Sequence, residues 1–105
     1  MYSLRFHKQI ALDIRNARNW YNEEKLGLGN DLERSIFSCF EFIKSNPQMC
    51  PKRYNKVRIR KVNKTFPYYI HYEVNTKSQE IMFWGVFHGK RNPKKWQKRV
   101  KGSFK

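Results

Sequence analysis

The feature that most constrains the fold of this chain is a pair of helical stripes with the same spacing. In each stripe, apolar residues recur four, three and four positions apart: Ile10, Ile14, Ala17 and Tyr21, then Leu32, Ile36, Cys39 and Ile43. Such a repeat places the apolar side chains on one face of an α-helix. Between the stripes stands Gly27-Leu28-Gly29, which offers a glycine for a left-handed cap at the end of the first helix. The pattern predicts two antiparallel helices joined by a tight turn.

The ends of the two helices can also be predicted. The first helix is expected to run from about residue 8 to Lys25. Asn30, followed three residues later by Glu33, has the pattern of a capping box at the start of the second helix. That helix is expected to stop before Asn46-Pro47, because proline disfavours helical geometry in the residue that precedes it.

Alternation of apolar and polar residues, the period of a half-buried strand, flanks the hairpin on both sides. It begins at Tyr2, Leu4 and Phe6 and returns over residues 56–60 and 68–74, while residues 81–87 are apolar on both faces, as in a central strand. Residues 48–54 are expected to form a loop, and residues 94–100 a short helix or a loose tail. The predicted fold class is α+β: an N-terminal strand, an antiparallel helical hairpin and a three-stranded antiparallel meander in one sheet. The 105 residues are expected to form a single domain, with 97–105 as a basic tail.

Positive charge is concentrated in the second half of the chain. The formal net charge is +15, and 16 of the 23 lysines and arginines lie in residues 51–105. Residues 51–64 and 90–105 carry no carboxylate at all, so an anionic partner is expected. Lys56, Arg58 and Arg60 fall on one face of a predicted strand, about 6.8 Å apart, a row that can follow a phosphate backbone. A solvated strand face is the alternative, and the charge density favours the binding role.

His88 and several aromatic residues are further candidates for a site. His88 stands at the end of a buried strand and could act as a general acid or base, since histidine titrates near neutral pH. On residue chemistry alone, a role in holding the adjacent turn is favoured. Tyr54, Tyr69 and Trp96 could stack on nucleic-acid bases, although packing in the core is the favoured role for most aromatic side chains here.

Several kinds of site have no counterpart in the sequence. Cys39 and Cys50 are too few for a disulfide framework or a zinc site, and there is no phosphate-binding glycine loop, so neither a metal nor a cofactor is expected. No apolar run approaches the roughly 20 residues needed to cross a membrane. Charged residues throughout the first twenty positions are unlike the core of a signal peptide. A cytoplasmic location without a membrane partner is therefore expected.

Four short stretches occur in an order and spacing that are specific when taken together. They are Ala17-Arg-Asn-Trp20-Tyr21, Gly27-Leu28-Gly29, Phe66-Pro67-Tyr68-x-Ile70-x-Tyr72 and Val86-Phe87-His88-Gly89-x-Arg91-Asn92-Pro93-x-x-Trp96. From about Ser3 to Trp96, the chain resembles the RelE/ParE superfamily of bacterial type II toxins, and the ParE-like branch most closely. The resemblance implies the same α+β fold that the periodicity predicts.

The resemblance also implies a partner. A toxin of this kind slows growth until a small antitoxin, encoded beside it, neutralises it by laying a flexible segment over the helical hairpin and the sheet. An acidic antitoxin fits the excess of positive charge, because a disordered acidic segment can fold onto such a surface. Trp20, Tyr21 and Arg58 are the expected antitoxin contacts.

Two targets remain open under the resemblance. ParE-like members act on DNA gyrase, whereas RelE-like members cut messenger RNA on the ribosome. The His-Gly-x-Arg-Asn-Pro run is ParE-like, so gyrase is the expected target. The expected contacts to target or nucleic acid are Lys56, Arg58, Arg60, Lys90, Arg91, Lys94 and Lys95. If the chain is instead an endoribonuclease, the resemblance implies the catalytic residues His88, Arg58, Arg60 and Arg91. A nucleic-acid-binding protein without toxicity is a third alternative.

Overall fold

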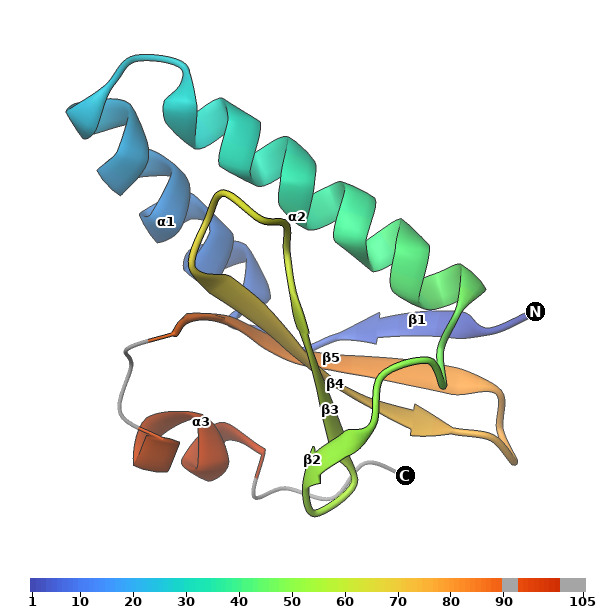
Figure 1. Ribbon diagram of the computed structural model, residues 1–105. Helices are drawn as coiled ribbons and strands as arrows, with labels where there is room; N and C mark the ends of the chain where they lie inside the picture. Colours follow the sequence, from blue (N-terminus) through green and yellow to red (C-terminus); the bar gives the residue numbers. More distant parts are fainter. Residues whose placement is uncertain (90–92, 101–105) are drawn as a thin grey trace.

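The computed structural model of the chain describes residues 1–89 and 93–100, apart from the side chains of 93–95. Two long helices lie together on one face of a twisted sheet, and a third, short helix lies on the other side of it (Figure 1). In chain order the elements are β1 (Ser3–Phe6), α1 (Ile10–Glu24), α2 (Leu28–Ser45), β2 (Lys52–Tyr54), β3 (Val57–Lys61), β4 (Tyr68–Asn75), β5 (Glu80–His88) and α3 (Pro93–Arg99). The α+β class predicted from the sequence is confirmed.

The sheet has five strands in the order β1-β5-β4-β3-β2. β3, β4 and β5 form the predicted antiparallel meander, and β1 joins β5 in parallel, with Leu4 opposite Ile81. A parallel partner needs a long crossover, which the helical hairpin supplies. The loop predicted over residues 48–54 is wrong at its end, because Lys52–Tyr54 pairs with β3 as an edge strand. Three residues are too few to show a period in the sequence.

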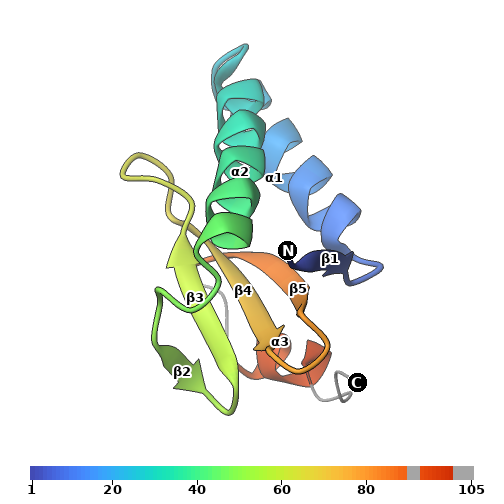
Figure 2. The same ribbon diagram turned by 90° about the vertical axis from the view of Figure 1, so that its right-hand side faces the viewer.

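The helical stripes supply one side of the core. Their members Ile10, Ile14 and Ala17 in α1 are buried, and so are all four stripe residues of α2, while Tyr21 is half-buried. They pack on the side chains that β4 and β5 direct toward the helices, among them Ile70 and Phe83, which are fully buried. Each such aliphatic or aromatic side chain contributes roughly 1.5–3 kcal/mol by leaving water. Figure 2 shows α1 and α2 side by side above the sheet.

The turn between the helices differs from the expectation in detail. α1 ends at Glu24, and α2 already begins at Leu28, so the capping box expected at Asn30 and Glu33 does not form. Glu33 instead accepts from the Arg18 guanidinium of α1 at 3.4 Å. Gly27, at φ +91°, occupies the left-handed conformation directly before α2 rather than a cap at the end of α1. The short connection needs this conformation, which glycine adopts without strain.

Gly29 lets the two helices approach each other. Its backbone N–H donates to the side-chain oxygen of Asn22 at 2.7 Å. A Cβ atom at this position would lie 1.9 Å from the carbonyl oxygen of Arg18, which is far inside van der Waals contact. The close packing of the hairpin at its turn therefore depends on glycine at position 29.

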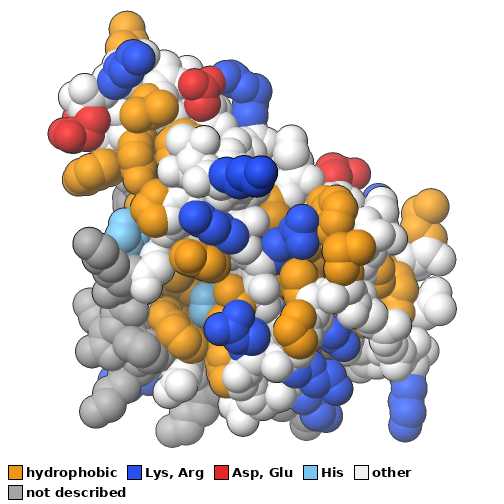
Figure 3. Space-filling view, viewed as in Figure 1, with side chains coloured by type: hydrophobic (Ala, Val, Ile, Leu, Met, Phe, Trp, Pro, Cys, Tyr) orange, Lys and Arg blue, Asp and Glu red, His pale blue; other side chains and the backbone are white. Residues whose placement is uncertain are grey.

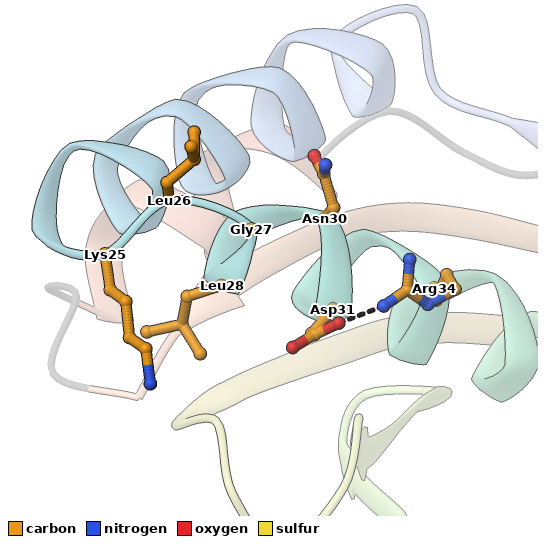
Figure 4. A pocket seen from close by; sticks show the side chains of 7 residues that line it. All are labelled: Lys25, Leu26, Gly27, Leu28, Asn30, Asp31 and Arg34. Carbon is orange, nitrogen blue, oxygen red and sulfur yellow. Dashed lines mark hydrogen bonds and ion pairs between the residues drawn. The ribbon is translucent and has the colours of Figure 1, made fainter.

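A hollow of about 300 Å³ lies at the turn (Figure 4). The ion pair of Asp31 and Arg34 stands at one side of it, and Leu26 points away into solvent, where its side chain is almost fully exposed. α2 ends at Ser45, before Asn46-Pro47, as predicted. None of the described helices is both long enough and apolar enough to cross a membrane.

Candidate functional site

The sheet face away from the helical hairpin carries an aromatic cluster centred on His71 of β4. The ring centroid of His71 lies 4.9 Å from that of Phe87 in β5, 4.7 Å from that of Trp96 in α3 and 5.8 Å from that of Tyr54 in β2. Trp96 also contacts Tyr54, at 5.0 Å. Because α3 covers this face, His71 is only 3% exposed although it stands on the polar side of its strand's alternation.

A hydrogen bond between Tyr54 and His71 joins β2 to β4. The Tyr54 hydroxyl and His71 Nδ1 are 2.9 Å apart. Burial, together with the nearby Arg99 cation, lowers the pKa of His71 to about 4, so its ring is neutral at pH 7. Burial, with a smaller contribution from Glu73, raises the pKa of the Tyr54 hydroxyl, which therefore stays protonated at pH 7. Both groups are neutral, and the His71 tautomer decides which of them donates.

A cavity of about 270 Å³ opens beside this cluster, and we refer to it as the aromatic cavity. Its lining comes from four strands and α3: Arg53, Ile59, Tyr69, His71, Phe87, His88, Gly89 and Trp96. Tyr69 and Trp96 supply flat, half-buried walls, and Arg53 supplies a guanidinium. From the sequence, Tyr69 and Trp96 are candidates for base stacking with packing as the favoured role, and Arg53 belongs to the cation run of residues 51–64, but no pattern indicated His71 as part of a site.

A buried ion pair fixes α3 against this face. Arg99 Nη2 donates to Asp13 Oδ1 at 3.1 Å, and Nη1 donates to Oδ2 at 2.5 Å. The side chains are 12% and 7% exposed, respectively. The Arg99 guanidinium also lies 4.7 Å from the ring centroid of Phe87. The pair thus connects α1, at the start of the chain, to α3 at its end, and it holds Arg99 over the aromatic cluster.

The ion pair also supplies hydrogen-bond partners to backbone groups at a β-bulge in the sheet. In the ladder between β4 and β5, Tyr72 pairs with Phe83 and His71 with Gly85, which leaves Trp84 as the extra residue of a bulge. Arg99 donates to the Trp84 carbonyl at 3.4 Å, and Asp13 accepts from the Val86 N–H at 3.1 Å. A Cβ on Gly85 would lie 2.8 Å from Arg99 Nη1, so glycine is needed there. No sequence pattern indicated these partners.

Arg58 and Arg60 share a face of β3, as the alternation predicts, but this face points toward α2. Arg58 Nη1 donates to the carbonyl oxygens of Gln48 and Cys50. Arg60 lies over the Phe42 ring, 3.9 Å from its centroid, and its Nη1 donates to Cys50 Sγ at 3.7 Å. Both arginines are half-buried and brace the loop that leads from α2 to β2. Lys56, in the turn before β3, is exposed.

The remaining candidates lie at the end of β5 and on the hairpin. Aromatic contacts run from Trp20 to Tyr21 at 4.8 Å, from Tyr21 to Tyr68 at 6.1 Å and from Tyr68 to His88 at 5.2 Å. Trp20, at the outer end of this series, is 55% exposed. His88 lines the aromatic cavity, whereas Arg58 and Arg60 do not. Lys90 and Arg91, and the side chains of Lys94 and Lys95, lie outside the described residues.

A second groove runs along the outer side of the hairpin. Its volume is about 510 Å³, and its lining includes exposed apolar side chains, Leu12 and Phe37, together with the cations Lys8, Arg15 and Arg18. Cationic side chains are also spread over the face seen in Figure 3, where the acidic ones are confined to the upper part of the view. Among the described residues, no group of three or more His, Cys, Asp or Glu side chains is placed to hold a metal ion.

We compared the chain with families and structures of known proteins. The sequence matches the family model of the ParE toxin of the type II toxin–antitoxin system parDE over residues 4–93. The chain belongs to the ParE toxin family. The toxin–antitoxin assignment and the ParE-like branch expected from the four stretches are thereby confirmed, and a ParE toxin implies a cognate antitoxin. No curated protein sequence matches this ParE family member.

Two solved structures show the same fold. One is a chromosomal ParDE toxin–antitoxin system from P. aeruginosa, with a TM-score of 0.71 and 15% sequence identity over 84% of this chain and 96% of that one. The other is the isolated RelE toxin of E. coli, with a TM-score of 0.63 and 14% identity over 96% of this chain and 97% of that one. At such low identities the likeness establishes the architecture alone, so it does not separate the two possible targets.

Proposed function

We propose that this ParE family toxin arrests growth by acting on DNA gyrase and that an acidic cognate antitoxin neutralises it. The match to the ParE toxin family over residues 4–93 carries this proposal. The proposed target contacts are cations of the second half of the chain: Lys56, Arg58, Arg60, Lys90, Arg91, Lys94 and Lys95. A cytoplasmic site of action is part of the proposal, because gyrase works on the bacterial chromosome there.

The contacts of Arg58 and Arg60 count against the alternative of messenger-RNA cleavage. Cleavage of RNA requires charge stabilisation and proton transfer at a single site. The guanidinium of Arg58 is bound to loop carbonyls, and that of Arg60 lies on Phe42. His88 stands beside Tyr68 and lines a cavity that neither arginine reaches. The four residues of the nuclease alternative therefore receive no support as a joint catalytic site, with Arg91 outside the described residues.

The helical hairpin is the proposed antitoxin surface. Trp20 is exposed and Tyr21 half-buried at one end of it, and the groove beside Leu12 and Phe37 is flanked by cations. An antitoxin segment that combines apolar and acidic side chains would match both properties. Arg58 is also proposed as a contact, at which the antitoxin would compete with the carbonyl oxygens of Gln48 and Cys50.

Induced expression with pulse-labelling tests the target. If gyrase is the target, incorporation of labelled thymidine should stop before incorporation of labelled amino acids. Co-expression of the small acidic protein encoded next to the toxin gene should restore growth. Arrest of protein synthesis before DNA synthesis, with transcripts cut on ribosomes, would overturn the proposed target. Normal growth on expression would overturn the toxic activity itself.

A further inference from the structure

The aromatic cavity lies on the opposite sheet face from the proposed antitoxin surface, and the proposed function assigns it no ligand. We propose that it binds one unpaired nucleobase of a single-stranded nucleic acid. The inference stands independently of gyrase as the target. It rests on three properties of the cavity: its flat walls, the fixed polar group of His71 and the cations at its edge.

The walls suit a flat heterocycle. Tyr69 of β4 and Trp96 of α3 present half-buried aromatic surfaces, and Ile59 of β3 adds an aliphatic one, whereas the Phe87 ring is only 2% exposed. The volume of about 270 Å³ is just below the range of about 300–1,000 Å³ that is typical of drug-sized ligands. A single base fits a cavity of this size, and a duplex does not. Stacking of a base on an aromatic side chain is the main source of affinity in proteins that bind single strands.

His71 gives the cavity a polar group with a fixed position. Its Nδ1 is bonded to the Tyr54 hydroxyl at 2.9 Å, so Nε2 is the ring nitrogen left for a ligand, as a donor or an acceptor according to the tautomer. The edges of nucleobases carry both acceptors and donors for such a group. The ring cannot rotate freely, because it is packed between Phe87 and Trp96.

The charges beside the cavity match a phosphate backbone. Arg53 of β2 belongs to the lining, and the exposed Lys56 stands three residues further on, in the turn between β2 and β3. Residues 51–64 contain no carboxylate. A strand with one base in the cavity would pass its phosphates along the β2–β3 turn, where each neutralised phosphate releases counterions. An acidic peptide would pair with the cations, but its carboxylates would not stack on the aromatic side chains of the cavity.

Fluorescence anisotropy with short labelled oligonucleotides tests the proposal. The probes are a single-stranded DNA, a single-stranded RNA of the same sequence and a blunt DNA duplex of equal length. We expect at least one single strand to bind about tenfold more tightly than the duplex, although the duplex carries more charge. Comparison of DNA with RNA identifies the source of the base. Equal or tighter binding of the duplex would overturn the proposal.

Two pairs of variants separate the cavity from general electrostatic attraction. Tyr69→Leu keeps the apolar bulk but removes the stacking surface and should weaken single-strand binding about tenfold, whereas Tyr2→Leu, directly before β1, should not. Arg53→Ala should weaken it about fivefold, and Lys77→Ala, which removes an equal charge from the distant β4–β5 turn, less than about twofold. Thermal melting checks that each variant is folded. Equal effects of the two variants within either pair would contradict the proposal that the cavity binds a base. Tighter binding of an acidic peptide than of the oligonucleotide, if it depends on Tyr69, would also contradict this proposal.

Discussion

Asp13 in α1 and Arg99 in α3, 86 positions apart in the chain, form a bidentate ion pair that is almost completely buried. The Asp13 carboxylate also accepts from the Val86 N–H of β5, and the Arg99 guanidinium also donates to the Trp84 carbonyl oxygen at the bulge of the same strand. One pair of side chains therefore connects the hairpin, the central strand and the helix that covers the aromatic cluster.

Replacement of Asp13 by alanine should strongly destabilise the protein. The change leaves the Arg99 cation buried without its partner and the Val86 N–H without an acceptor, which together cost about 3–5 kcal/mol. Urea unfolding measures this loss. Asp31→Ala is the matched control, because its ion pair with Arg34 is exposed and contributes at most about 1 kcal/mol. A loss of less than about 1 kcal/mol for Asp13→Ala would show that the buried pair is not a structural link.

The stability of the protein should fall as the pH is lowered from about 6.5 to 4. The pKa of His71 is lowered from 6.5 to about 4 in the folded protein, chiefly by burial. In this interval the unfolded chain binds a proton that the folded chain does not, so protonation favours unfolding by roughly 3 kcal/mol at most. His71→Gln should flatten this dependence in urea titrations at several pH values.

His7 is the control for the pH dependence. Its pKa is also lowered, mainly by burial, but it is much less buried than His71. His7→Gln should therefore leave most of the dependence in place. If His71→Gln and wild-type protein lost stability in parallel between pH 6.5 and 4, His71 would not be the group responsible.

Substitution of either glycine at the hairpin turn by alanine should destabilise the fold to different extents. At Gly29 the new Cβ would collide with the Arg18 carbonyl oxygen, and separation of the helices should cost about 3 kcal/mol or more. At Gly27 nothing lies within 4 Å, so only the left-handed backbone conformation is penalised, by about 1–2 kcal/mol. Calorimetric melting of both variants gives the comparison. The reverse order would contradict the packing described for Gly29.

Trp20 should contribute to antitoxin binding without contributing much to stability. Its side chain is 55% exposed, so Trp20→Ala should change the free energy of unfolding by less than about 1 kcal/mol. An exposed tryptophan at an interface commonly contributes about 2 kcal/mol, so affinity for the cognate antitoxin should fall roughly 30-fold in titration calorimetry. Leu26→Ala, at the exposed tip of the turn, should bind normally. Unchanged affinity of Trp20→Ala would remove Trp20 from the proposed surface.

The fold could be predicted because its main signals are local and periodic. The stripes that begin at Ile10 and Leu32 required two helices, and alternation over residues 68–74 required a strand with one apolar face. The predicted start of α2 is too late in the chain. Asn30 and Glu33 match a capping box, but their side chains bond to Asn22 and Arg18 of α1 and do not cap α2. A sequence pattern cannot show that a stronger long-range partner is available.

The candidate site was much less predictable, because its contacts join distant segments. His71 lies on the polar side of its strand's alternation, which indicates exposure, yet α3 places Trp96 over it. Of the predicted row of cations, Arg58 and Arg60 lie on β3, and Lys56 lies in the turn before it. Its arginines nevertheless contact the loop after α2, since their side of β3 is the one that α2 covers.

A gyrase supercoiling assay with purified protein tests the central claim most directly. Relaxed plasmid, gyrase and ATP are incubated with increasing amounts of the toxin, with and without its cognate antitoxin. The proposal predicts that supercoiling is inhibited in proportion to the toxin and that the antitoxin restores it. Full supercoiling at a large molar excess of folded toxin, together with cleavage of ribosome-bound transcripts by the same preparation, would contradict it.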